Sequence, residues 1–279
     1  MPPVRRGLWD YFHIIANIPG LCRASGLESC PGALMKALCY AGIAIACMVA
    51  GVPALRAQIP SPSLIAPQQI PRDGTYAAGE KTEFIIDHRG DQVRLRFSGS
   101  DEVFYLSSEA APLGARVLKY DTGDPALRVT GWGGVTLYTP EARTGVPAEY
   151  SDVVHNVDPP PVPANDVKRF AAGLAHDLNA GGDLIIGFAA DWNILAQSAG
   201  TRELVCDAMR DTTYALEQVT TGPARNAIAD HLHVVHIVER DRPSAVLRGG
   251  VLTVTVAPKI GEAGRPSSLA IAHALHAGF

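Results

Sequence analysis

The spacing of hydrophobic positions changes part-way along the chain, and this change predicts two regions of different structure. Over residues 75–139, apolar residues tend to recur at every second position in short runs. That spacing is typical of strands with one buried face. The clearest example places Val93, Leu95 and Phe97 on one face and arginines on the other.

Clusters of Gly, Asp and Pro separate these short runs and predict the turns between strands. The expected strands are 84–86, 93–97, 103–106, 115–120, 126–129 and 135–138. Arg89-Gly90-Asp91 lies in a predicted hairpin turn. This tripeptide also occurs in integrin ligands, but Gly and Asp are ordinary turn residues, and we interpret it as a turn. Regularly spaced short strands indicate an antiparallel sandwich or barrel.

After a proline-rich stretch, the apolar positions recur every three or four residues, which predicts amphipathic helices. The expected helices are 166–178, one after Thr201, 224–230 and 267–277; the expected strands are 184–188, 232–239 and 245–256. The predicted fold class is α+β. An N-terminal antiparallel β sandwich-like or barrel-like unit is followed by a helix-rich unit closed by a β-hairpin.

An uncharged apolar run covers residues 37–50 and predicts export. It has the length of a signal-peptide core and is shorter than the about 20 residues of a transmembrane helix. We expect the signal to start at Met35 and to be cleaved between Ala57 and Gln58, which places the protein in the periplasm or outside the cell. A lipoprotein and an uncleaved anchor are the alternatives, and only the latter keeps this segment in a membrane.

The predicted organisation follows from these patterns. It comprises a mis-called or disordered extension (1–34), the signal peptide (35–57), a Pro-rich linker (58–72), the antiparallel β unit (73–157), a Pro-rich bridge (158–164) and an α/β unit (165–279).

Charge and cysteine content change markedly once the signal peptide is removed. Residues 1–57 hold five of the 24 basic and two of the 28 acidic residues, so the remainder carries a net charge of −7. A nucleic-acid partner needs a basic face, and we predict none. Cys206 is the only cysteine after residue 57, so no intrachain disulfide can form. Its apolar neighbours indicate a core residue.

A histidine-rich segment at 230–236 is the strongest metal-site candidate in the sequence. If residues 232–239 form a strand that extends to His231, then His231, His233 and Glu239 lie on the same side of it, where they could bind zinc. The alternative is a strand with a solvated histidine face, and we favour it. The sequence otherwise predicts no cofactor.

Aromatic residues near the turns are candidates for a ligand or partner surface, in particular Trp132 and Tyr138. The alternative is that they pack in the core. The chain after residue 57 has no G-x-S-x-G, H-E-x-x-H or Walker motif, so we assign no catalytic residue.

Three segments carry a resemblance. Val117–Gly123, Gly131–Thr139 and Gly145–Ala148 resemble a family of exported bacterial proteins of unknown function, and the similarity is clearest over residues 75–160. The resemblance implies a secreted or periplasmic protein and transfers no catalytic residue.

The functional hypothesis is an exported periplasmic protein, non-catalytic, that binds a small ligand, an envelope component or a partner. The alternative is a hydrolase or metal-dependent enzyme that uses the face formed by His231, His233 and Glu239.

Overall fold

A computed structural model gives the structure of the chain after the predicted signal segment. It describes residues 70–152, 158, 161–180, 184–195, 198–221 and 225–278. The predicted extension, the signal peptide with its cleavage site at Ala57 and Gln58, and most of the 58–72 linker lie outside these residues. Ile65–Phe279 form one compact unit, and the predicted domain boundaries inside it stay a prediction.

Eight antiparallel strands form a closed barrel in which each strand pairs with the next and β1 pairs with β8. The strands are β1 (Gly74–Ala78), β2 (Thr82–Arg89), β3 (Gln92–Phe97), β4 (Phe104–Ala110), β5 (Arg116–Lys119), β6 (Pro125–Val129), β7 (Val135–Leu137) and β8 (Val146–Asp152). Of the two predicted architectures, the structure therefore has the barrel.

Alternating side chains fill the interior of the barrel, as the period-two pattern predicts. Phe84, Ile86 and Leu95 are fully buried there, together with Leu127 and Leu137 from the opposite strands. Arg94 points outward between Val93 and Leu95. It is nevertheless buried, because other parts of the compact unit cover the outer wall at this place.

The strand that closes the barrel differs from the prediction. No strand is predicted in the β unit after residues 135–138, yet Val146–Asp152 form β8. Most β8 side chains are exposed, so the segment lacks the apolar alternation by which a strand is recognised. Pairing with its neighbours determines the position of this strand. β8 pairs with β1 and β7, and the closed barrel therefore has no free edge.

The C-terminal part of the chain builds a helical layer on a mixed sheet. Its elements are η3 (Ala164–Asp166), α1 (Val167–Asn179), β9 (Gly187–Ala190), α2 (Trp192–Leu195), α3 (Ala199–Thr220), α4 (Arg225–His231), β10 (Val234–Glu239), β11 (Ser244–Arg248), β12 (Val251–Val256), η4 (Pro258–Ala263) and α5 (Ser268–Gly278). The strand order is β11-β12-β10-β9. The predicted α+β class is confirmed.

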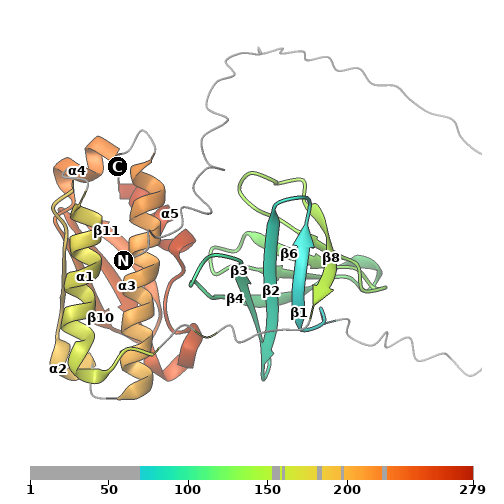
Figure 1. The fold of residues 1–279 in the computed structure, drawn as a ribbon, viewed down its shortest axis with the longest axis horizontal. Helices are drawn as coiled ribbons and strands as arrows, with labels where there is room; N and C mark the ends of the chain where they lie inside the picture. Colours follow the sequence, from blue (N-terminus) through green and yellow to red (C-terminus); the bar gives the residue numbers. More distant parts are fainter. Residues whose placement is uncertain are drawn as a thin grey trace, which may run out of the picture. The chain divides into compact units, whose positions relative to one another are not determined.

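Helices α1 and α3 lie across one face of this sheet (Figure 1). Their apolar stripes meet the inward side chains of the strands, including Val235, Ile237 and Val254. Met209 and Leu216 of α3 are fully buried in the same cluster. The predicted helical stripe after Thr201 is therefore the face of α3 that forms this core.

The predicted pairing of residues 232–239 with 245–256 as a hairpin is wrong. Gly249 and Gly250 both have positive φ angles, 55° and 80°, and split the second segment into β11 and β12. These two strands form the hairpin, because glycine adopts that turn conformation without steric cost. Strand β10 runs parallel to β12.

Within the described ranges, none of the helices has the length and apolar character needed to cross a membrane.

Candidate functional site

A cleft of about 530 Å³ with a mixed polar and apolar lining is the candidate site. Its walls are formed by residues of β2, β4, η4 and the first turns of α3, together with Asp158, Pro161 and Val162. The polar residues that line it are Arg89, Tyr105, Asp158, Ser198, Thr201, Glu203, Asp207, Arg210 and Glu262. The lining also has apolar residues, among them Val103, Val162 and Leu204, so the cleft offers both polar and apolar surface.

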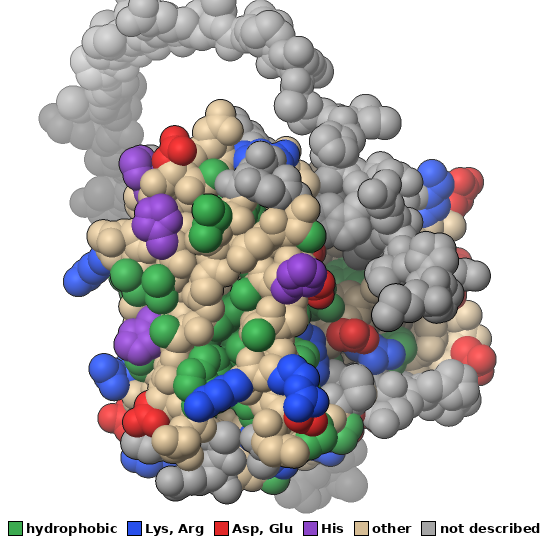
Figure 2. All heavy atoms as spheres, turned by 60° about the vertical axis from the view of Figure 1, so that its left-hand side comes forward, with side chains coloured by type: hydrophobic (Ala, Val, Ile, Leu, Met, Phe, Trp, Pro, Cys, Tyr) green, Lys and Arg blue, Asp and Glu red, His purple; other side chains and the backbone are tan. Residues whose placement is uncertain are grey.

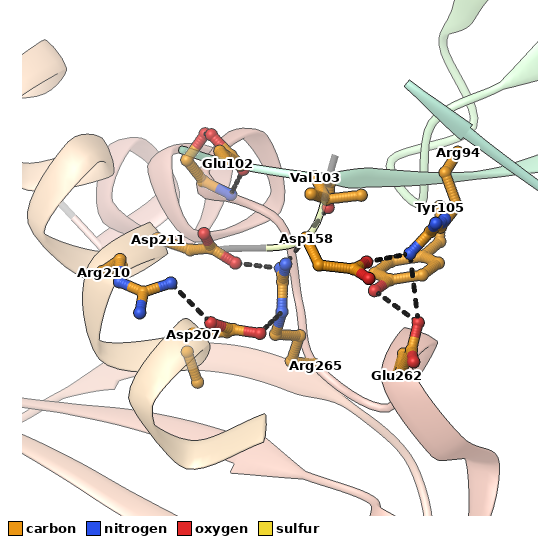
Figure 3. A network of polar contacts seen from close by, with 12 residues as sticks. Arg94, Glu102, Val103, Tyr105, Asp158, Asp207, Arg210, Asp211, Glu262 and Arg265 are labelled. Carbon is orange, nitrogen blue, oxygen red and sulfur yellow. Dashed lines mark hydrogen bonds and ion pairs between the residues drawn. The ribbon is translucent and has the colours of Figure 1, made fainter. Parts of the chain in front are cut away.

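Arg94 anchors the barrel side of the cleft. Its guanidinium donates a hydrogen bond to Asp87 on the neighbouring strand and another, 2.6 Å long, to Asp158. Glu262 of η4 lies 3.5 Å from the same guanidinium (Figure 3). Burial alone would lower the pKa of Arg94, but the carboxylates of Asp87 and Asp158 raise it, so the side chain stays charged.

The opening of the cleft carries a second arginine. Arg89 forms an ion pair with Glu262 and lies 3.6 Å from Asp158. Tyr105 donates a hydrogen bond of 3.3 Å to Glu262. We call Arg89, Asp158 and Glu262 the cleft rim. Their side chains are each about half exposed, so a ligand can reach them.

A buried charge cluster lies behind the cleft. Arg265 donates a hydrogen bond to Asp211 of α3 and another, of 3.1 Å, to the backbone carbonyl of Val103 (Figure 3). The side chains of Arg265 and Asp211 are only 3% and 1% exposed. Asp207 lies 3.8 Å from Nε of Arg265 and accepts a hydrogen bond of 2.7 Å from Arg210.

Two barrel carboxylates hold the N-terminus of α5. Glu102 accepts hydrogen bonds from the backbone N–H and the hydroxyl of Ser268, at 2.8 and 2.6 Å. Asp121 accepts the same pair of bonds from Ser267, at 2.7 and 2.6 Å. Free N–H groups and the helix dipole favour carboxylates at this position.

Burial raises the pKa of Glu102 to about 7, although the hydrogen bonds from Ser268 and the charge of Arg265 oppose the shift. The carboxyl group therefore gains a proton near neutral pH. We call Glu102, Asp211, Arg265 and Ser268 the buried seam.

The cleft lining combines charges of both signs. It holds four carboxylates and two guanidinium groups, and the carboxylates of Asp158, Asp207 and Glu262 already pair with arginines. Cys206 also lines it, but burial raises the pKa of its thiol to about 12, so the reactive thiolate is scarce at neutral pH.

A family model matches residues 54–275, which cover most of the chain. Its description is Domain of unknown function (DUF4908). The chain belongs to this family. The match spans the barrel, the cleft and the buried seam, so the family domain contains the whole candidate site. No curated protein and no solved structure matches the chain.

The predicted metal site depends on a strand that carries both His231 and His233, and this part of the prediction is wrong. His231 is the last residue of helix α4, and the strand begins only at Val234, so His231 and His233 do not share a strand face. Glu239 ends β10 at the other end of the strand. In the parts of the chain that the structure describes, no three His, Cys, Asp or Glu side chains are grouped closely enough to hold a metal ion. Histidines lie at several separate places on the face shown in Figure 2.

The two aromatic residues predicted for a partner surface lie apart. Trp132 is in the turn before β7 and is exposed, whereas Tyr138 follows β7 at its other end. The ring of Tyr138 lies against Gly145, where an added Cβ would come within 2.9 Å of it. Tyr138 is thus partly used in packing, and Trp132 remains available to a partner.

Sequence reasoning missed the charged residues of the cleft and the seam. One indication was present: Asp211 falls seven residues after Leu204, within the apolar stripe of α3, and a carboxylate in such a stripe needs a buried partner. No pattern in the neighbouring sequence identifies that partner as Arg265, which lies 54 residues further along the chain.

Proposed function

We propose that this protein is exported to the periplasm and binds a polar ligand there without chemical turnover. The apolar run at 37–50 supports export, and the cleft supports binding. The ligand is a small molecule or a segment of an envelope polymer that carries hydroxyl and amino groups.

The observation that carries the binding proposal is the composition of the cleft wall. Glu203 is an exposed carboxylate on α3, close in sequence to the hydroxyls of Ser198 and Thr201, and all three line the cleft. Together with the cleft rim, these side chains can accept hydrogen bonds from an ammonium group and form hydrogen bonds with sugar hydroxyls. The cavity volume lies within the usual range for small-ligand sites.

The competing function, a hydrolase or metal-dependent enzyme that uses His231, His233 and Glu239, loses support because His231 lies in a helix. It predicts stoichiometric zinc in the purified protein, bound through His231 and His233.

The test starts from the full chain expressed in a bacterial host. Protein recovered from the periplasmic fraction should begin at Gln58 when its N-terminus is sequenced. It is then titrated calorimetrically with glucosamine oligomers, which carry both amino and hydroxyl groups. We expect binding that Glu203→Gln weakens about tenfold, since this change removes one charge-assisted hydrogen bond.

Glu239→Gln is the matched control. It removes an exposed carboxylate from the end of β10, outside the cleft, and should leave the affinity unchanged. Equal losses in both variants would indicate non-specific attraction and overturn the cleft assignment. Absence of the protein from the periplasm would overturn export, and bound zinc lost in a His231→Ala/His233→Ala variant would favour the hydrolase.

A further inference from the structure

Two neighbouring loops of the barrel expose large apolar side chains. Leu113 lies between β4 and β5, in η2 (Pro112–Gly114), and Trp132 lies between β6 and β7; they are 85% and 79% exposed. Alternate connections of an up-and-down barrel return to the same end, so both loops lie at one end. Their backbones touch, since a Cβ on Gly131 would lie 2.7 Å from the carbonyl oxygen of Leu113. We call Leu113 and Trp132 the apolar tip.

Hydrogen bonds at the base hold both loops in place. The N–H of Ala111 donates to the carbonyl of Ala115, and that of Thr130 to the carbonyl of Gly134, each at 2.8 Å. Leu113 itself has a φ of 62°, a left-handed conformation that a leucine rarely adopts. A glycine would fit there without strain, yet the position carries an apolar side chain that points into solvent.

The two segments that carry the apolar tip are basic, opposite in sign to the protein as a whole. Segments 110–118 and 126–137 contain Arg116 and Arg128 and no acidic residue, whereas the chain after residue 57 has a net charge of −7. Arg128 is exposed and forms no ion pair with any described residue. The acidic residue that precedes the first segment, Glu109, is neutralised by an ion pair with Lys119.

We propose that the apolar tip docks the protein onto the surface of a lipid bilayer that contains anionic headgroups. Tryptophan favours the membrane–water interface, a leucine beside it can enter the acyl region, and arginines behind the tip attract anionic lipids. The two side chains protrude from loops, which suits insertion into a soft surface better than occupation of a partner's preformed pocket. The proposal is independent of the cleft and its ligand.

The experiment uses the chain from Gln58 onward, which contains the whole compact unit and excludes the apolar run at 37–50. Cooperative thermal unfolding is checked first for every variant. Trp192→Phe leaves Trp132 as the only tryptophan of this chain. Mixing with vesicles of phosphatidylcholine and phosphatidylglycerol should shift Trp132 emission to the blue, and the protein should float with the vesicles. Vesicles of phosphatidylcholine alone should bind it less.

Leu113→Asn removes the apolar side chain and keeps a residue that tolerates positive φ. We expect the affinity for vesicles to fall about tenfold, because one apolar side chain no longer moves from water into the membrane. Ile185→Asn is the matched control, because Ile185 is 80% exposed in another part of the chain. Its vesicle binding should equal that of the parent.

Three results would overturn the proposal. The first is unchanged Trp132 emission with vesicles that contain phosphatidylglycerol. The second is equal loss of vesicle binding in Leu113→Asn and Ile185→Asn. The third is a dimer in sedimentation that Leu113→Asn dissociates, because the tip would then bind a second copy of the chain.

Discussion

The buried seam and the cleft rim both consist of arginines and carboxylates, but they differ in their exposure to water. Arg265 and Asp211 of the seam are almost fully buried, whereas Arg89 and Glu262 of the rim are about half exposed. Removing one partner of a buried pair leaves an uncompensated charge, while water solvates an exposed charge that loses its partner. The same residue types therefore stabilise the fold in the seam and remain available to a ligand at the rim.

Arg265→Leu tests the seam and should have the largest effect. Without the guanidinium, Asp211 is left as a buried, unpaired carboxylate, and the carbonyl of Val103 loses a donor. We expect the free energy of unfolding to fall by about 3–5 kcal/mol, measured by urea denaturation. A loss below about 1 kcal/mol would contradict this role of the seam.

A second variant keeps this prediction testable if Arg265→Leu does not fold. Arg265→Leu combined with Asp211→Leu removes both charges and should recover part of the lost stability, because no unpaired buried charge remains. A double variant less stable than the single one would show that the pair itself, rather than the unpaired charge, accounts for the loss.

Glu102 makes the stability of the seam depend on pH. Its pKa is about 7 in the folded protein, against an ordinary value of 4.5, so the folded state binds a proton more tightly than the unfolded state. The contribution of Glu102 to stability is therefore greatest below the unfolded pKa and is lost as the pH rises through 7. The loss between about pH 5 and about pH 8 should be on the order of 2–3 kcal/mol.

Glu102→Gln isolates this effect, because the amide is similar in shape and does not titrate. Urea denaturation across the pH range should show a stability difference between parent and variant that shifts in the variant's favour as the pH rises. A constant difference would show that Glu102 keeps one protonation state throughout. The other charged groups near it, Arg265, Asp121 and Asp211, are present in both proteins.

The contrast between seam and rim also explains how far the sequence could predict this molecule. Local periodicity predicted most strands and the main helices, because each pattern reports which face of an element is buried. It could not predict β8, whose side chains are mostly exposed, or distinguish a barrel from a sandwich, since closure depends on pairing between β1 and β8.

The candidate site was hidden for a related reason. Glu102 bonds Ser268 across 166 residues, and Arg265 bonds Val103 across 162. No local pattern relates such positions. The histidine segment was conspicuous in the sequence. The metal site predicted from it required a strand that includes His231, but β10 starts three residues later. Asp211 within the apolar stripe of α3 was the more informative residue, because burial of a charge implies a partner.

Arg89→Gln tests the cleft rim and should have the smallest effect on stability. Arg89 is about half exposed, and both of its carboxylate partners, Glu262 and Asp158, are also hydrogen-bonded by other side chains. Solvent screens the lost ion pair, so we expect the free energy of unfolding to change by less than about 0.5 kcal/mol.

Arg94→Gln is the matched comparison on the same wall of the cleft. Arg94 shares Asp158 and Glu262 with Arg89, but its side chain is only 7% exposed, and its loss also leaves Asp87 without that partner. Urea denaturation should therefore show a clearly larger loss for Arg94→Gln than for Arg89→Gln. Equal losses would mean that exposure to water does not determine how much stability a lost arginine removes, and the physical basis for separating buried from exposed charges in this molecule would fail.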